Sequence, residues 1–106
     1  MSIHIQARGF LLTKALKSVV QESILKVTER HHEVRTVAVR LEDINGNQHG
    51  GIDKSCRVVL NLDHAPSLVL QSTQSDMYLA IRHCASRLKQ TLNRNSERLK
   101  GKYTEH

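Results

Sequence analysis

Lysine and arginine side chains, whose chemistry is the binding of phosphate oxygens, are concentrated in residues 76–102. This stretch holds seven Lys and Arg against two acidic residues, a net charge of +5, whereas the rest of the chain holds nine against eight. At the roughly 100° per residue of an α-helix, its apolar and basic residues separate onto two faces. The apolar face consists of Met77, Ile81, Cys84, Ala85, Leu88, Leu92 and Leu99. The basic face consists of Arg82, Arg87, Lys89, Arg94, Arg98 and Lys100. This pattern fits either a phosphate-binding helix or the solvated outer face of an ordinary amphipathic helix.

The other reactive side chains lack the spacing that catalysis or metal binding requires. Cys56 and Cys84 form no CxxC pair, and both fall at apolar positions, where a thiol is usually an inert core residue. His31 and His32 are adjacent, so they point apart on a helix, and no third ligand is spaced nearby. No HExxH, nucleotide fingerprint or Ser-His-Asp arrangement stands out. We therefore expect no catalytic residue, no metal and no cofactor.

Composition points to a polyanionic partner. The 106 residues suffice for one domain, with a net charge of +6 and a sequence pI of about 9.8. Only 3% of residues are aromatic, too few for a platform that stacks unpaired bases. Recognition of folded RNA by shape and phosphate is the better fit. No apolar run could span a bilayer, and the N-terminus lacks the pattern of a signal peptide. We expect a cytoplasmic protein with no membrane partner.

The elements that must position these residues follow from periodicity. Strands are predicted at residues 2–8, 34–44, 55–63 and 68–73, where apolar and polar residues alternate. One helix begins after a cap at Thr13 and runs to about Arg30, and a second spans residues 76–102. The order β-α-β-β-β-α predicts an α+β fold, a four-stranded sheet with both helices packed on one face. We expect one domain over residues 1–100 and a short flexible tail at 101–106.

Several motifs resemble the ribosome hibernation factors, that is hibernation-promoting factor and the ribosome-associated inhibitor, once known as sigma-54 modulation proteins. The most specific is Asp-Met-Tyr-x-Ala-Ile at residues 76–81, and Thr-Lys-Ala-Leu-Lys at 13–17 is similar to the start of the family's first helix. The strand at 34–41 matches its Val-x-Val-x-Leu strand, and the loop region 43–56 resembles one subgroup. Basic positions of the family match Arg87, Arg94, Arg98 and Lys100, whereas Arg82 stands where the family often has an acid.

The resemblance implies binding to the small ribosomal subunit and its rRNA, in the channel for mRNA and tRNA, with inhibition of translation in stress or stationary phase. It implies no catalysis, no cofactor and no small-molecule substrate. Lys54 and Arg57 are further RNA-binding candidates, from the loop and the sheet. The chain looks like a short form, expected to be monomeric off the ribosome, and its brief tail favours the type that promotes ribosome dimers over the type that holds single ribosomes.

Two alternatives remain open at this point. One is a general module for structured RNA that acts away from the ribosome, and the other is a regulator that binds a protein partner.

Overall fold

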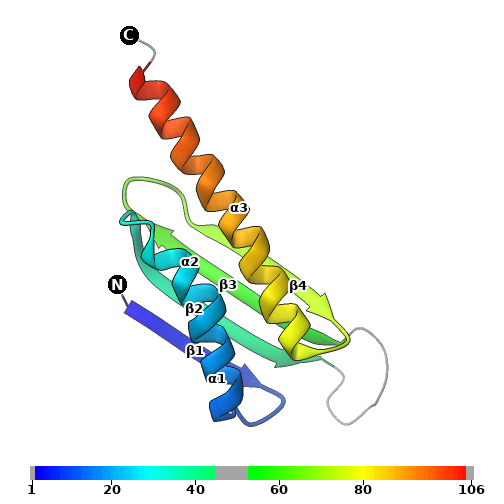
Figure 1. The fold of residues 1–106 in the computed structure, drawn as a ribbon. Helices are drawn as coiled ribbons and strands as arrows, with labels where there is room; N and C mark the ends of the chain where they lie inside the picture. Colours follow the sequence, from blue (N-terminus) through cyan, green and yellow to red (C-terminus); the bar gives the residue numbers. More distant parts are fainter. Residues whose placement is uncertain (1, 45–52, 105–106) are drawn as a thin grey trace.

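Two helical segments cover one face of a four-stranded sheet and leave the other face open (Figure 1). The computed structural model describes residues 2–44 and 53–104, with side chains described as far as Arg94. The elements, in chain order, are β1 (Ser2–Arg8), α1 (Lys14–Val20), η1 (Gln21–Leu25), α2 (Lys26–Glu29), β2 (Val34–Asp43), β3 (Lys54–Leu62), β4 (Leu68–Gln74) and α3 (Met77–Thr104). The predicted α+β fold with both helices on one face is confirmed.

The strands lie in the order β1-β2-β3-β4, and the sheet is mixed. β1 and β2 are parallel, because the first helical segment crosses over between them, as a parallel pair requires. β2 pairs antiparallel with β3, and β3 with β4, through short connections. Antiparallel pairing therefore joins β2, β3 and β4, and within the described residues β1 is the one parallel strand of this sheet. The molecule therefore has two distinct surfaces. One is the open face of the sheet, and the other is formed by the helices that cover the opposite face.

The first helical segment is continuous but not uniformly α-helical. Thr13 caps it as predicted, since its Oγ1 accepts a hydrogen bond of 3.1 Å from the Leu16 backbone N–H. A π-helical turn, η1, interrupts the α-helix between α1 and α2. Because a π turn adds a residue to the α-helical repeat, it changes which side chains share a face. Ile24 stays fully buried, and Lys26 and Arg30 remain exposed.

The core lies between the helices and the sheet. The apolar face predicted for the last helix is buried as far as side chains are described, and Ala80 belongs to it as well. The sheet contributes Val34, Val37, Val39, Leu41, Cys56, Val58 and Leu60, and the first helical segment contributes Leu16, Val20 and Ile24. This one layer of packed apolar side chains fixes α3 against β3 and β4.

Element ends differ from the predictions by one or two residues. α3 runs to Thr104 rather than ending at Lys102, and its C-terminal part extends past the sheet (Figure 1). The predicted loop at 45–51 lies outside the described residues, and the division between a domain at 1–100 and a tail at 101–106 stays a prediction. Within the described residues, no helix combines the length and the apolar character that crossing a bilayer requires.

Candidate nucleic-acid interface

Three basic side chains from two helical segments meet at a groove. Lys26 and Arg30, in and just after α2, lie beside Lys89 of α3 around a hollow of about 160 Å³. The full lining is Lys26, Val27, Arg30, His31, Lys89 and Asn93. No carboxylate is among these residues, so the groove is a concave site of positive charge. Lysine and arginine in such a place bind phosphate oxygens.

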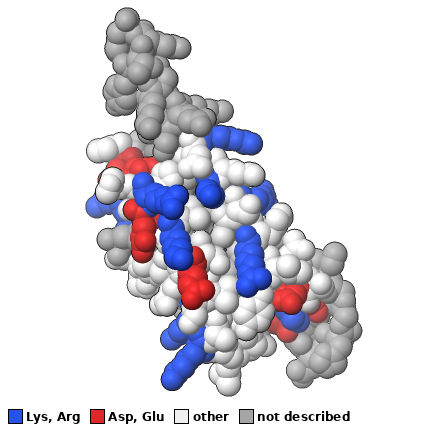
Figure 2. Space-filling model, viewed as in Figure 1, with Lys and Arg blue, Asp and Glu red and all other residues white. Residues whose placement is uncertain are grey.

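Lys89 lies on the basic face predicted for the last helix, whereas Lys26 and Arg30 are not among the sequence-predicted RNA-binding residues. The excess of positive charge in the first helical segment is small, because its four basic residues are offset by two exposed acids, Glu22 and Glu29. The sequence therefore contains little indication that Lys26 and Arg30 belong to a basic surface. Only the packing of that segment beside α3 shows which of its cations join the basic face of the last helix. Figure 2 shows Lys and Arg across the helix-bearing face, with acidic side chains between some of them.

The described basic residues of α3 are all exposed, but they are not equivalent. Arg87 Nη1 donates a hydrogen bond of 3.1 Å to the backbone carbonyl of Gln71, so this side chain ties α3 to the edge strand β4. Arg82, Lys89 and Arg94 make no such bond within the described part of the chain. The side chains of Arg98 and Lys100 lie outside the described residues, and their RNA-binding role stays a prediction.

Lys54 is held by two carboxylates. Its Nζ lies 3.0 Å from Asp43 Oδ2 and 3.1 Å from Asp53 Oδ1. Hydrogen bonds to Asp43 and then to Asp53 raise the pKa of the Lys54 ammonium. Asp53 is only 3% exposed, so the lysine balances charge that the fold has buried. This arrangement gives Lys54 a structural role and leaves the cluster with a negative net charge.

Arg57 lies on the other surface, the open face of the sheet. It is exposed on β3, directly opposite Arg40 of β2. Arg57 is therefore separated by the whole sheet from Lys89 and from the groove between the helices. The sequence-predicted basic residues thus divide between two opposite surfaces rather than forming one patch.

Cys56 and Cys84 are both buried, as predicted, and both are free thiols. What the sequence did not indicate is that they meet, one from β3 and one from α3. The hydrogen bond with Cys84, together with burial, raises the pKa of the Cys56 thiol. Cys84 Sγ also lies 3.8 Å from the Leu70 carbonyl, to which it can donate. The pair has the character of core packing, because both sulfur atoms are buried where reagents do not reach them.

The paired histidines do not form a metal site in the structure. His31 Nδ1 lies 3.2 Å from Glu33 Oε1, and His32 is exposed. Among the residues that the structure describes, no group of three or more His, Cys, Asp and Glu side chains is placed to hold a metal ion.

The fold and the charge distribution define a class, a small basic α+β domain whose cations lie on packed helices and on an open sheet. Comparison with known families identifies the group. The chain belongs to the family described as sigma 54 modulation protein / S30EA ribosomal protein, whose model matches residues 3–100. This confirms the family that the sequence motifs resembled. No curated protein matches the chain.

Two solved structures share the fold. A ribosomal subunit interface protein from Coxiella burnetii has a TM-score of 0.75 at 14% identity, covering 92% of this chain and 99% of its own. The N-terminal domain of Thermus thermophilus Protein Y has a TM-score of 0.71 at 19% identity, covering 89% and 98%. At these identities the likeness establishes the fold.

Proposed function

We propose that this protein binds the small ribosomal subunit at the mRNA–tRNA channel and blocks translation during stress or stationary phase. The helix-bearing face contacts rRNA, and the protein acts by occupying the channel. Neither catalysis nor a cofactor takes part, and the protein acts in the cytoplasm as a monomer until it meets the ribosome.

The observation that carries this proposal is the convergence of Lys26, Arg30 and Lys89 on one groove without a carboxylate. The helical segments that carry these cations are packed into the core through their opposite faces, so the backbone positions of the three residues are fixed relative to one another. Fixed cations suit a phosphate surface of defined shape, and the scarcity of aromatic residues argues against reading of unpaired bases. Membership of a family that includes S30EA ribosomal proteins supports the ribosome as the partner.

Blocking by occupancy requires affinity for phosphate-lined RNA and no base-specific chemistry. Each Lys or Arg that contacts a phosphate releases counterions, so binding should weaken steeply as salt rises. In such a complex, the logarithm of the binding constant falls linearly with the logarithm of salt concentration, by about 0.9 per phosphate contact for a duplex.

The test is co-sedimentation of the purified protein with small ribosomal subunits over a series of salt concentrations. We expect Arg30→Gln/Lys89→Gln to weaken binding about tenfold and to reduce the salt slope by about 2. The matched control is Arg8→Gln/Arg35→Gln, which removes the same charge from the sheet. Arg35 is paired with Asp63 at 3.3 Å, and Arg8 faces Glu42 across the β1–β2 ladder. We expect the control to bind within about twofold of the wild type.

Three outcomes separate the alternatives. Wild-type protein that fails to pellet with small subunits would contradict the proposal. Pelleting that mRNA and tRNA cannot displace would move the site away from the channel, toward a general module for structured RNA. Capture of a protein partner that resists both salt and nuclease would favour the protein-binding regulator.

A further inference from the structure

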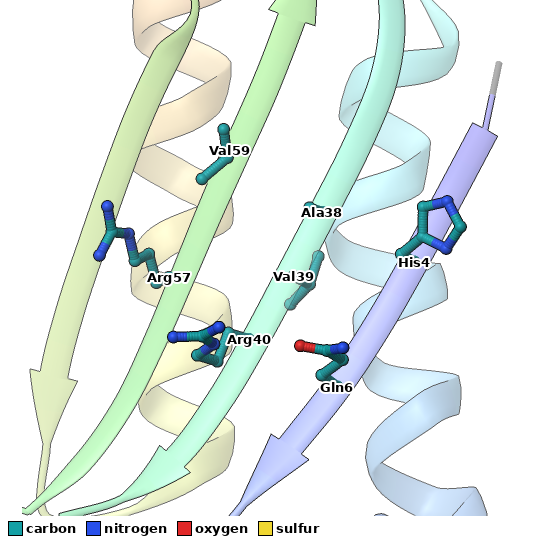
Figure 3. Close-up of a pocket in the computed structure, with 7 residues that line it drawn as sticks. All are labelled: His4, Gln6, Ala38, Val39, Arg40, Arg57 and Val59. Carbon is teal, nitrogen blue, oxygen red and sulfur yellow. The ribbon is translucent and has the colours of Figure 1, made fainter.

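Two arginines stand directly opposite each other on the face of the sheet that the helices leave open. Arg40 on β2 and Arg57 on β3 are register partners, and both side chains are exposed. Figure 3 shows the two side chains on neighbouring strands, with the helices behind the sheet. Directly opposite residues have Cβ atoms about 5 Å apart, and like charges there destabilise a sheet. The free protein therefore carries a local repulsion that a bound anion would remove.

The row of side chains that contains this pair has no carboxylate. Gln6 of β1 is the register partner of Arg40, and Gln71 of β4 is the register partner of Arg57. The acid of β2 on the same face, Glu42, lies in the next row, opposite Arg8. Within the described residues, neither Arg40 nor Arg57 makes an ion pair. Both charges are thus available to a ligand.

A hollow of about 420 Å³ adjoins the pair (Figure 3). Its lining is His4, Gln6, Ala38, Val39, Arg40, Arg57 and Val59. Ala38 lies between His4 and Val59 in its row, and its short side chain leaves room for a ligand to approach the sheet. The lining contains no Phe, Tyr or Trp side chain of the kind that anchors a protein interface.

We propose that Arg40 and Arg57 together bind a phosphodiester group of an RNA strand that lies across the open face of the sheet. Guanidinium groups bind phosphate oxygens through paired, charge-assisted hydrogen bonds. One diester between two arginines would replace their repulsion with attraction to a shared anion. This inference rests on the proposed function and extends it, because the domain then lies between two RNA surfaces, one at the helices and one at the sheet.

The first measurement is binding to small ribosomal subunits over a salt series. Arg40→Gln/Arg57→Gln should weaken binding about tenfold and reduce the salt slope by about 2. Arg8→Gln/Arg35→Gln, which removes equal charge from the same sheet, should stay within about twofold of the wild type. An affinity and a slope equal to those of this control would overturn the inference and leave the proposed function standing.

The second measurement is thermal unfolding, which does not depend on the ribosome. Without RNA, Arg40→Gln/Arg57→Gln should unfold roughly 2–5 °C higher than the wild type, because the repulsion is gone. An RNA duplex of about 20 base pairs should raise the unfolding temperature of the wild type and of the control more than that of the double variant. A contact that only stabilised the fold would give the opposite change in the free protein.

Two further outcomes decide the remaining cases. If the wild type does not pellet with ribosomal subunits, the proposed function fails. The change in unfolding temperature on adding the RNA duplex then tests phosphate binding by Arg40 and Arg57 independently of the ribosome. Equal changes in the double variant and in the control would overturn the inference. If poly-glutamate stabilises the wild type through Arg40 and Arg57 more than the duplex does, the partner is an acidic protein and the RNA assignment is overturned.

Discussion

Lys54 and Asp43 are register partners at the end of the β2–β3 ladder, and their side chains form an ion pair of 3.0 Å. Lys54 also pairs with Asp53, whose backbone carbonyl accepts a hydrogen bond of 2.9 Å from the Ile44 N–H. The lysine therefore closes the ladder at the point where the described part of the hairpin ends. This relationship distinguishes a cation held by two carboxylates from the exposed cations for which we propose a role in RNA binding.

We expect Lys54→Gln to lower the unfolding temperature, because it leaves two partly or fully buried carboxylates without their cation. Thermal unfolding of the single variants and of Lys54→Gln/Asp43→Asn forms a double-mutant cycle, in which the two losses should be less than additive. Lys14→Gln, at an exposed position of α1, serves as the control. A normal unfolding temperature together with weakened ribosome binding would identify Lys54 as an RNA contact instead.

Gly9 should be intolerant of a side chain. Its φ is +86°, and a Cβ at this position would lie 2.8 Å from the Asp43 backbone oxygen. We expect Gly9→Ala to cost about 1–2 kcal/mol in the free energy of unfolding, from the left-handed backbone alone, and the close contact adds to this loss. Chemical denaturation measures it, with the exposed Ser18→Ala in α1 as a neutral comparison. An unchanged midpoint for Gly9→Ala would mean that the turn after β1 can rearrange freely.

Arg82 and Arg87 should respond differently to the same substitution. Arg87 donates a hydrogen bond to the edge strand β4, whereas Arg82 makes no such bond within the described residues. Arg87→Gln should reduce the free energy of unfolding by about 0.5–1 kcal/mol. Arg82→Gln should leave stability within about 0.5 kcal/mol of the wild type and act only on RNA binding. Denaturation and ribosome co-sedimentation on both variants check this, and equal losses of stability would contradict it.

The buried Cys56 thiol should make the fold sensitive to alkaline pH. Its raised pKa means that the unfolded chain, with a thiol pKa near 9.0, loses its proton before the folded protein does. The folded state then binds more protons at this thiol, so its contribution to stability is present below the unfolded pKa and is lost as the pH rises above about 9. The free energy of unfolding from pH 7 to 10 should show this decline.

Replacing Cys56 removes both a titrating thiol and a packing contact in the core. The control must therefore distinguish a change in the pH dependence of stability from a loss of stability at every pH. Cys56→Ala should be less stable at pH 7 but should decline less toward pH 10. Val58→Ala, in the same strand and also buried, should lose stability at every pH while keeping the wild-type slope. Equal slopes for Cys56→Ala and the wild type would show that another group governs the alkaline decline.

Much of the fold was predictable because it depends on periodicity. The alternation of residues 2–8 gives the bounds observed for β1, and the two-faced pattern after residue 76 correctly predicts which side of α3 is buried. Thr13 caps its helix through a hydrogen bond with the backbone of Leu16, three residues later in the chain. The π turn η1, which packs against α3, was not predictable from the apolar spacing of this segment, which fits an uninterrupted α-helix.

The sequence by itself determined the family, the α+β class and the net positive charge, because these depend on residue type and spacing along the chain. Only the tertiary structure decided which charges act together. Helix packing places Arg30 and Lys89 at the same groove, and strand register places Arg40 opposite Arg57. Lys54 forms ion pairs with two carboxylates. Apart from the contact between Lys54 and its neighbour Asp53, these pairings arise between residues that are not adjacent in the chain. Strand register and helix packing determine which charged residues lie together. Both depend on the burial of the whole apolar core.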